Sequence, residues 1–361
     1  MQVSTLIDGG VVPGFEVRGP EVTFDVRPKQ TLLNVVLLDV PEELTMHFLF
    51  DEFGAPHVIR QGILLSEDGI RYSPHPLQPT GDGKWSITVR PGGKKLGVAT
   101  RYPYGRDGFD RLVCDIAGCA YIRPRIFNRD FRSLPVLECG VDDGRKPIHY
   151  IIAGEDISES AGTMVTDEMV RFLATDKAIA EALLGKALVR FVPLVSLHCA
   201  ARPLTASYDT LAGAGIYGAS KWRDEEPPPE YAILRDQVDQ TIAEKRLGLL
   251  FCLHSHQAEC ITSEMEYVRS GGENTLRPAR DAAAKQALDQ LLEGLPSTNG
   301  APKEKAWFPG LARDYLMHRH NVVSYRIEIT TAGVTTDYFK QMGQQILRNV
   351  TAVPDWSFVQ P

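Results

Sequence analysis

Four largely apolar segments constrain the fold of this chain most strongly. They are 148–154, 189–197, 247–254 and 322–330, and each has the length of one strand that is buried on both faces. Between them, apolar residues recur at helical spacing, which predicts amphipathic helices at 163–174, 178–189 and 231–246. Buried strands that alternate with helices predict an α/β domain that occupies residues 101–361.

The first hundred residues follow a different pattern. From Val3 to about Thr100, short runs alternate apolar and polar residues, and turns containing Gly or Pro separate them, as in TGDGKW and RPGGKK. This pattern predicts a separate antiparallel β domain at residues 1–100. Segments 199–220 and 262–305 are rich in Gly, Ala, Ser and Pro, and we expect them to be connections.

Composition and charge exclude several classes of protein. The 46 acidic and 39 basic side chains give a formal charge of −7 and are mixed along the chain, so there is no basic stripe for nucleic acid. No apolar run approaches the roughly 20 residues that a membrane helix needs. The six cysteines form no CxxC pair and follow no signal-like segment, which favours a reducing cytoplasm. The oligomeric state is not readable from the sequence.

Polar side chains gather where the predicted strands end. The first strand runs into Glu155, Asp156 and Glu159. The second is followed by His198 and Cys199, the third carries His254 and His256, and the fourth carries Glu328. Ligands of α/β proteins usually bind at the carboxyl edge of the sheet, so we expect these residues to form the functional site.

The order of these segments resembles the zinc carboxypeptidases, and within them the cytosolic branch with a β-sandwich before the catalytic domain. The resemblance implies a carboxypeptidase-like α/β/α domain with a mixed central sheet, preceded by an antiparallel β-sandwich domain. It extends over nearly the whole chain and rests on STLIDGGVV (4–12), YPYGRDGFDRL (102–112), DDGRKPIHYIIAG (142–154), KALVRFVPLVSL (186–197), LLFCLHSH (249–256) and SYRIEIT (324–330).

The same resemblance implies a zinc site made by Asp156, Glu159 and His254. Asp156 stands where the family's His-x-x-Glu motif has His, and Cys252 stands where the family has Asp two residues before the third ligand. Three protein ligands and one open position are what a hydrolytic zinc site needs, although two carboxylates also suit Mn or Mg. Helix capping by Asp156 and Glu159 is an alternative, as is a hydrogen-bonded core role for His254. His256 is a possible substitute ligand.

Glu328 is the predicted general base, because the family's base occupies this point of its last strand. Alternation places Ser324, Arg326, Glu328 and Thr330 on one face of that strand. As a base, Glu328 would take a proton from the attacking water and pass it to the leaving amine. The alternative is an ordinary ion pair with Arg326. A thiol nucleophile made by His198 and Cys199 is disfavoured, since adjacent strand residues point to opposite faces.

The family's Asn-Arg pair, which anchors the terminal carboxylate of a peptide, has no counterpart here. The matching segment reads Tyr217-Gly218-Ala219-Ser220. Arg202, Lys221 and Arg223 lie in or beside this connection and are the predicted replacement cations, with solvated surface charges as the alternative reading.

Two functions are consistent with these residues. The leading hypothesis is a metal-dependent carboxypeptidase-like hydrolase that cleaves an amide bond near a peptide end. The competing hypothesis is a catalytically inactive relative that binds a peptide or protein partner in the same pocket. The altered first ligand and the missing anchor favour the second, whereas Glu159, His254 and Glu328 favour the first.

Overall fold

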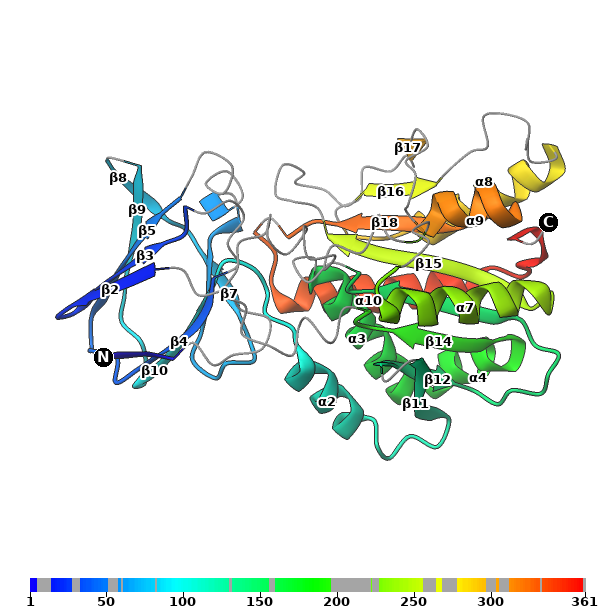
Figure 1. Ribbon diagram of the computed structural model, residues 1–361, viewed down its shortest axis with the longest axis horizontal. Helices are drawn as coiled ribbons and strands as arrows, with labels where there is room; N and C mark the ends of the chain where they lie inside the picture. Colours follow the sequence, from blue (N-terminus) through cyan, green and yellow to red (C-terminus); the bar gives the residue numbers. More distant parts are fainter. Residues whose placement is uncertain are drawn as a thin grey trace.

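The computed structural model of the chain has two parts that lie side by side, with the N-terminal sheets at one end and the C-terminus at the other (Figure 1). The residues described are 1–4, 14–27, 33–50, 58–59, 61–81, 83–129, 132–155, 160–195, 222, 227–255, 264–267, 278–296, 303–304, 312–331 and 333–359.

Two five-stranded sheets build the N-terminal part. One has the strand order β1-β4-β10-β6-β7 and the other β2-β3-β5-β9-β8. The bounds are β1 Gln2–Ser4, β2 Gly14–Arg18, β3 Glu21–Asp25, β4 Asn34–Leu38, β5 Leu44–Leu49, β6 Ile63–Ser66, β7 Ser73–His75, β8 Gln78–Gly81, β9 Lys84–Val89 and β10 Lys95–Ala99.

Alternation along the strands explains why these two sheets pack together. In β5, Leu44, Met46 and Phe48 are buried while the residues between them are half-buried. They join one apolar cluster with residues of both sheets, and the rings of Phe24 and Phe48 stack at 5.5 Å. The prediction of an antiparallel arrangement is wrong for one pair: β3 and β5 run parallel, because β4 lies between them in the chain and belongs to the other sheet.

The C-terminal part contains a mixed eight-stranded sheet, as predicted. Its order is β11-β12-β14-β13-β15-β18-β16-β17, and the central strands β14, β13, β15 and β18 are parallel to one another. The bounds are β11 Ile122–Arg129, β12 Arg132–Cys139, β13 Ile148–Ala153, β14 Leu188–Val192, β15 Leu247–Ser255, β16 Glu264–Tyr267, β17 Lys303–Glu304 and β18 Tyr325–Ile329.

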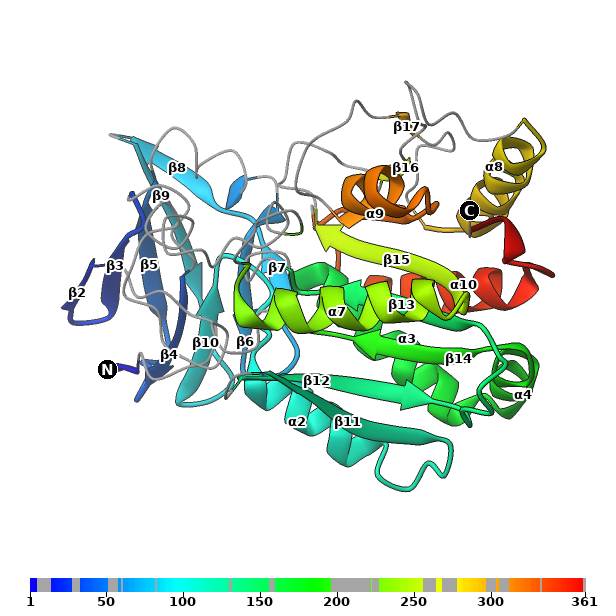
Figure 2. The same ribbon diagram turned by 45° about the vertical axis from the view of Figure 1, so that its right-hand side comes forward.

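Helices cover both faces of this sheet (Figure 2). Helices α3, α4 and α10 pack together on one face and α8 lies against α10, whereas α7 covers the other face and contacts α9. The bounds are α2 Arg106–Asp115, α3 Ser160–Thr175, α4 Lys177–Lys186, α7 Pro229–Ala243, α8 Pro278–Leu292, α9 Ala312–His320, α10 Thr336–Ala352 and the short 3-10 helix η2 Ser357–Val359. No described helix combines the length and the hydrophobicity that crossing a bilayer would require.

The predicted elements differ most from those of the structure at three places, and the predicted connection 199–220 lies outside the described residues. The strand predicted at 189–197 ends at Val192. The helix predicted at 178–189 ends at Lys186, because Leu188 already begins β14. The predicted connection 262–305 contains β16 and the fifteen-residue helix α8, whose small and charged residues gave no clear amphipathic pattern. The division into domains 1–100 and 101–361 stays a prediction.

Candidate metal and catalytic site

The candidate site forms where β13 and β15 end beside each other. The two strands are parallel, and Ile152 is the register partner of Cys252. Gly154 follows β13 with φ of +63°, and a Cβ on it would lie 2.5 Å from the side chain of Leu194, so the turn requires glycine. The turn ends in Glu155. Cys252 and His254, two residues apart in β15, point to the same face.

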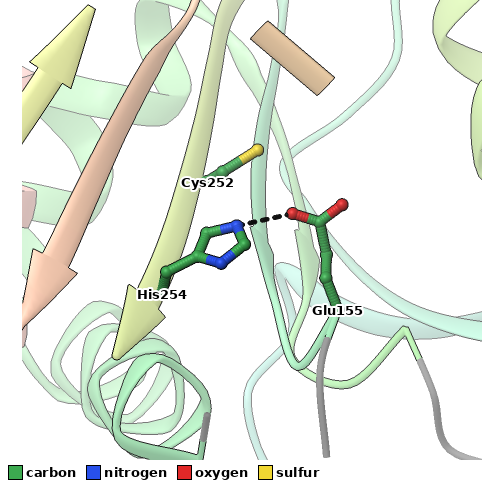
Figure 3. A group of neighbouring side chains, drawn as sticks. All are labelled: Glu155, Cys252 and His254. Atoms are coloured by element: carbon green, nitrogen blue, oxygen red, sulfur yellow. Dashed lines mark hydrogen bonds and ion pairs between the residues drawn. The ribbon is translucent and has the colours of Figure 1, made fainter. Parts of the chain in front are cut away.

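Glu155, Cys252 and His254 bring three metal-ligating groups together (Figure 3). One ligating atom from each lies within 4.8 Å of the others. His254 Nε2 and Glu155 Oε2 form a hydrogen bond of 2.8 Å. Each of the three residues is only 2–3% exposed. These residues will be called the Glu155–Cys252–His254 cluster.

Two further groups hold Glu155 in place. The indole N–H of Trp222 donates to Glu155 Oε1 over 2.6 Å, and the phenol of Tyr231, at the start of α7, donates to the backbone carbonyl of Glu155. Trp222 and Tyr231 are buried. Both carboxylate oxygens therefore have a hydrogen-bond partner, as buried polar groups generally do.

Burial controls the state of the Cys252 thiol. Removal from water, together with the negative charge of Glu155, raises the pKa of Cys252 to about 11, although the hydrogen bond with His254 acts in the opposite direction. The sulfur is consequently a protonated thiol at neutral pH. Only a strong positive charge such as a metal ion would ionise it there.

The donor set fits a zinc ion. A thiolate, an imidazole and a carboxylate are the ligands that zinc selects in proteins, whereas magnesium and calcium require oxygen. The sulfur and the carboxylate lie on the same side of the His254 ring in Figure 3, and Glu155 contacts Nε2. Ligands that converge on one point have this arrangement. A thiol–imidazole–carboxylate relay would instead use both ring nitrogens.

Glu328 lies in the strand next to His254. β15 and β18 are parallel, with His254 opposite Glu328 and Cys252 opposite Arg326. Glu328 is 4% exposed and forms an ion pair with Arg326, the alternative that the sequence left open. The register thus places the predicted base in the strand beside His254, where it pairs with Arg326.

Several predicted site residues lie outside the described part of the chain. They are Asp156, Glu159, Arg202, Lys221, Arg223 and His256. Their roles as ligands or as substrate-binding cations stay predictions. Among the described residues, the structure brings His254 and Glu328 to neighbouring strands.

Glu155 and Cys252 were not predicted to be ligands. A signal for Glu155 was present, because Ile152-Ala153-Gly154-Glu155 has the same spacing as His-x-x-Glu and spans the end of the strand. In that frame Ile152 stands in place of His, and its hydrocarbon side chain offers no donor. Cys252 gave no signal, since a cysteine in an apolar strand is most often a core residue.

Comparison with known proteins identifies the fold. No family model and no curated protein matches this sequence. Solved structures do match. A metallo-carboxypeptidase from Burkholderia cenocepacia has a TM-score of 0.75 at 15% identity and covers 98% of each chain. A metallo-carboxypeptidase from Pseudomonas aeruginosa, in complex with (2-guanidinoethylmercapto)succinic acid, has a TM-score of 0.76 at 15% identity and covers 97% of this chain and 98% of its own.

The mixed sheet and its helical layers therefore define an α/β protein with its candidate site at the carboxyl edge of the parallel strands. More narrowly, the chain has the fold of the metallo-carboxypeptidases over almost its whole length. The resemblance predicted from the sequence is confirmed at the level of the fold.

Proposed function

We propose that this protein is a metal-dependent hydrolase of the metallo-carboxypeptidase kind, which cleaves an amide bond near a peptide end. The observation that carries the proposal is the convergence of the Glu155–Cys252–His254 cluster at the carboxyl edge of the sheet. The metallo-carboxypeptidase fold supports it.

Zinc is the proposed cofactor, held by the Glu155–Cys252–His254 cluster. A zinc ion bound there would acidify a water molecule and polarise the scissile carbonyl. Glu328 would accept the proton of the attacking water and deliver it to the leaving amine. Asp156 and Glu159, which follow Glu155 by one and four residues in the chain, remain proposed ligands from the sequence. A reducing cytoplasm is the proposed location, and the four free cysteines of the described part, Cys252 included, agree with it.

The proposed substrate is a peptide with a free carboxylate near the cleaved bond. Arg202, Lys221 and Arg223 are the proposed cations for this carboxylate. The structure of the Pseudomonas metallo-carboxypeptidase is a complex with a succinic acid derivative, which carries carboxylates. This supports a carboxylate-bearing ligand for the present chain.

The second candidate function is binding without cleavage. Three observations favour it: the hydrogen bond between Glu155 and His254, the ion pair between Arg326 and Glu328, and the apolar Ile152 at the end of β13. An inactive site of this kind would keep the pocket and bind a peptide through its carboxylate. Metal content separates the two candidates.

The first test is metal binding by protein purified without chelator and without an affinity-tag metal. We expect one equivalent of zinc, and we expect Cys252→Ser to weaken zinc binding at least about tenfold. Cys139→Ser is the matched control, because Cys139 is also a buried free thiol but lies in β12, away from the cluster. Less than about 0.1 equivalent of zinc, with none taken up on titration, would end the hydrolase proposal.

The second measurement concerns Glu328. Glu328→Gln keeps the shape of the side chain and removes its basicity, so we expect unchanged zinc content and a loss of peptide hydrolysis of about 10²-fold or more. Variants Glu155→Gln, Asp156→Asn and Glu159→Gln, compared in the same zinc titration, distinguish the three proposed carboxylate ligands. Zinc binding without hydrolysis by the wild-type protein would establish the binding function instead.

A further inference from the structure

We propose that Trp222 is a positioning residue for the metal site: its indole N–H fixes one oxygen of Glu155 and so directs the other oxygen at the metal position. This inference rests on the proposed function and adds a residue to that site. Within the site, the indole of Trp222 donates its hydrogen bond to Glu155, one of the three metal donors.

The two oxygens of Glu155 have different partners. Oε1 accepts the indole N–H of Trp222 at 2.6 Å, and Oε2 contacts His254 Nε2 at 2.8 Å. The oxygen that faces His254 is thus Oε2, which does not accept the hydrogen bond of Trp222. A carboxylate held at one oxygen cannot rotate to exchange its two oxygens without losing a charge-assisted hydrogen bond.

Trp222 is itself held firmly. It is 1% exposed, its ring lies 5.9 Å from the ring of Tyr315 in α9, and its backbone carbonyl accepts a hydrogen bond of 3.1 Å from Arg235 in α7. The helices that cover one face of the sheet therefore fix the indole, and the indole fixes the carboxylate. Tyr231, also in α7, holds the backbone of the same glutamate.

Loss of this hydrogen bond should act on metal affinity. Hydrogen-bond partners that orient a metal ligand typically change metal affinity by about 10- to 100-fold when they are removed. An indole is suited to the role, because its N–H only donates a hydrogen bond and the ring does not act as a metal ligand itself. A purely structural tryptophan would leave metal affinity unchanged when replaced by another large aromatic residue.

The test compares Trp222→Phe with Trp356→Phe in a zinc competition titration against a chromophoric chelator. Trp222→Phe removes the N–H and keeps an aromatic ring, and we expect zinc to bind at least about tenfold more weakly. Trp356 is a buried tryptophan packed near His149 and Tyr325, so its replacement is the matched control and should leave zinc affinity within about twofold. The absorption spectrum of the cobalt(II) form should change in Trp222→Phe alone.

The wild-type protein supplies a second measurement that does not depend on the folding of Trp222→Phe. Nitrogen-15 labelling of the four tryptophans gives one indole N–H signal each, and the signal displaced by Glu155→Gln belongs to Trp222. Zinc addition should shift that signal and leave those of Trp85 and Trp356 in place.

The outcomes separate the two proposals. Zinc affinity of Trp222→Phe within about twofold of wild type, or an unmoved Trp222 signal on zinc addition, overturns the positioning role while the hydrolase proposal stands. Absence of zinc binding by the wild-type protein overturns the metal-dependent function, and the positioning role with it.

Discussion

Asp167 lies in α3, and its carboxyl group contacts Tyr104 in the segment that joins the two parts of the chain. It is 7% exposed, accepts a hydrogen bond of 2.5 Å from the phenol of Tyr104, and lies 3.9 Å from the guanidinium of Arg171. Burial raises the pKa of Asp167 to about 7, against the lowering effects of Tyr104 and Arg171. A single side chain thus titrates close to neutral pH.

We expect Asp167 to make the free energy of unfolding fall as the pH rises from about 4 to about 7. In this pH window Asp167 keeps its proton in the folded protein. In the unfolded chain it has lost the proton, because the ordinary pKa of an aspartate is 3.8. The stability that the neutral form contributes is therefore full at low pH and is lost as the pH rises, by at most about 1.4 kcal/mol per pH unit.

Asp167→Asn checks this expectation, because Asn cannot ionise and can still accept the hydrogen bond of Tyr104. We expect the free energy of urea unfolding of the variant, measured relative to wild type, to be about 3 kcal/mol more favourable to folding at pH 7.5 than at pH 4.5. If the free energies of unfolding of Asp167→Asn and wild type differ by the same amount at both pH values, Asp167 is already ionised in the folded protein at pH 4.5.

At the residue scale the site also shows what local sequence can reveal. The distance of Glu155 from the end of β13 was visible in the sequence, and so was its spacing from Ile152. The partnership with Trp222 was not visible, because 67 residues separate the two in the chain. Only the packing of the helices against the sheet brings an indole to that carboxylate.

At the scale of elements, the packing of α3 on β15 depends on Gly162. A Cβ at this position would lie 2.2 Å from the backbone carbonyl oxygen of Leu253, the residue before His254. No side chain can yield there, since the clashing atom belongs to the backbone of a central strand. The glycine lets the helix approach the strand that carries two of the metal donors.

We therefore expect Gly162→Ala to destabilise the protein by about 3 kcal/mol or more, because the helix must move away from the strand. Gly185→Ala is the matched control: Gly185 also lies in a helix, α4, but a Cβ there meets nothing within 4 Å. The control should gain up to about 1 kcal/mol, because alanine is the better helix former. Urea unfolding measures both, and equal effects would contradict the close contact.

At the scale of the whole molecule, one apolar cluster extends from the N-terminal sheets into the α/β part. Leu64, Tyr72 and Ala99 belong to the same cluster as the central sheet. Tyr102 packs edge to face on Phe339 at 4.8 Å, and its phenol donates to the carbonyl of Val334. A groove of about 890 Å³ runs between Arg71 and the helices α2, α3 and α10.

Because this cluster is shared, we expect the two parts to unfold together. Calorimetry and far-ultraviolet circular dichroism should show one transition at the same temperature. Two separate transitions would show that residues 1–100 fold independently, as the predicted domain boundary alone would allow.

The sequence by itself determined the four parallel strands at the centre of the sheet and the edge at which their polar side chains gather. Strands buried on both faces are mostly apolar, so β13, β15 and β18 could be predicted, and their ends marked the carboxyl edge of the sheet. The parallel β3–β5 pair and helix α8 were not legible, because strand direction and helix burial depend on partners far along the chain.

Only the tertiary structure decided which side chains meet. Cys252 and His254 face Glu155 because parallel pairing sets the register of β15 against β13 and because the left-handed turn at Gly154 directs the next residue toward that face. The same pairing places Glu328 opposite His254, with Arg326 as its counter-ion. Local periodicity encodes which face a residue occupies, whereas contacts between strands and helices depend on the packing of the whole domain.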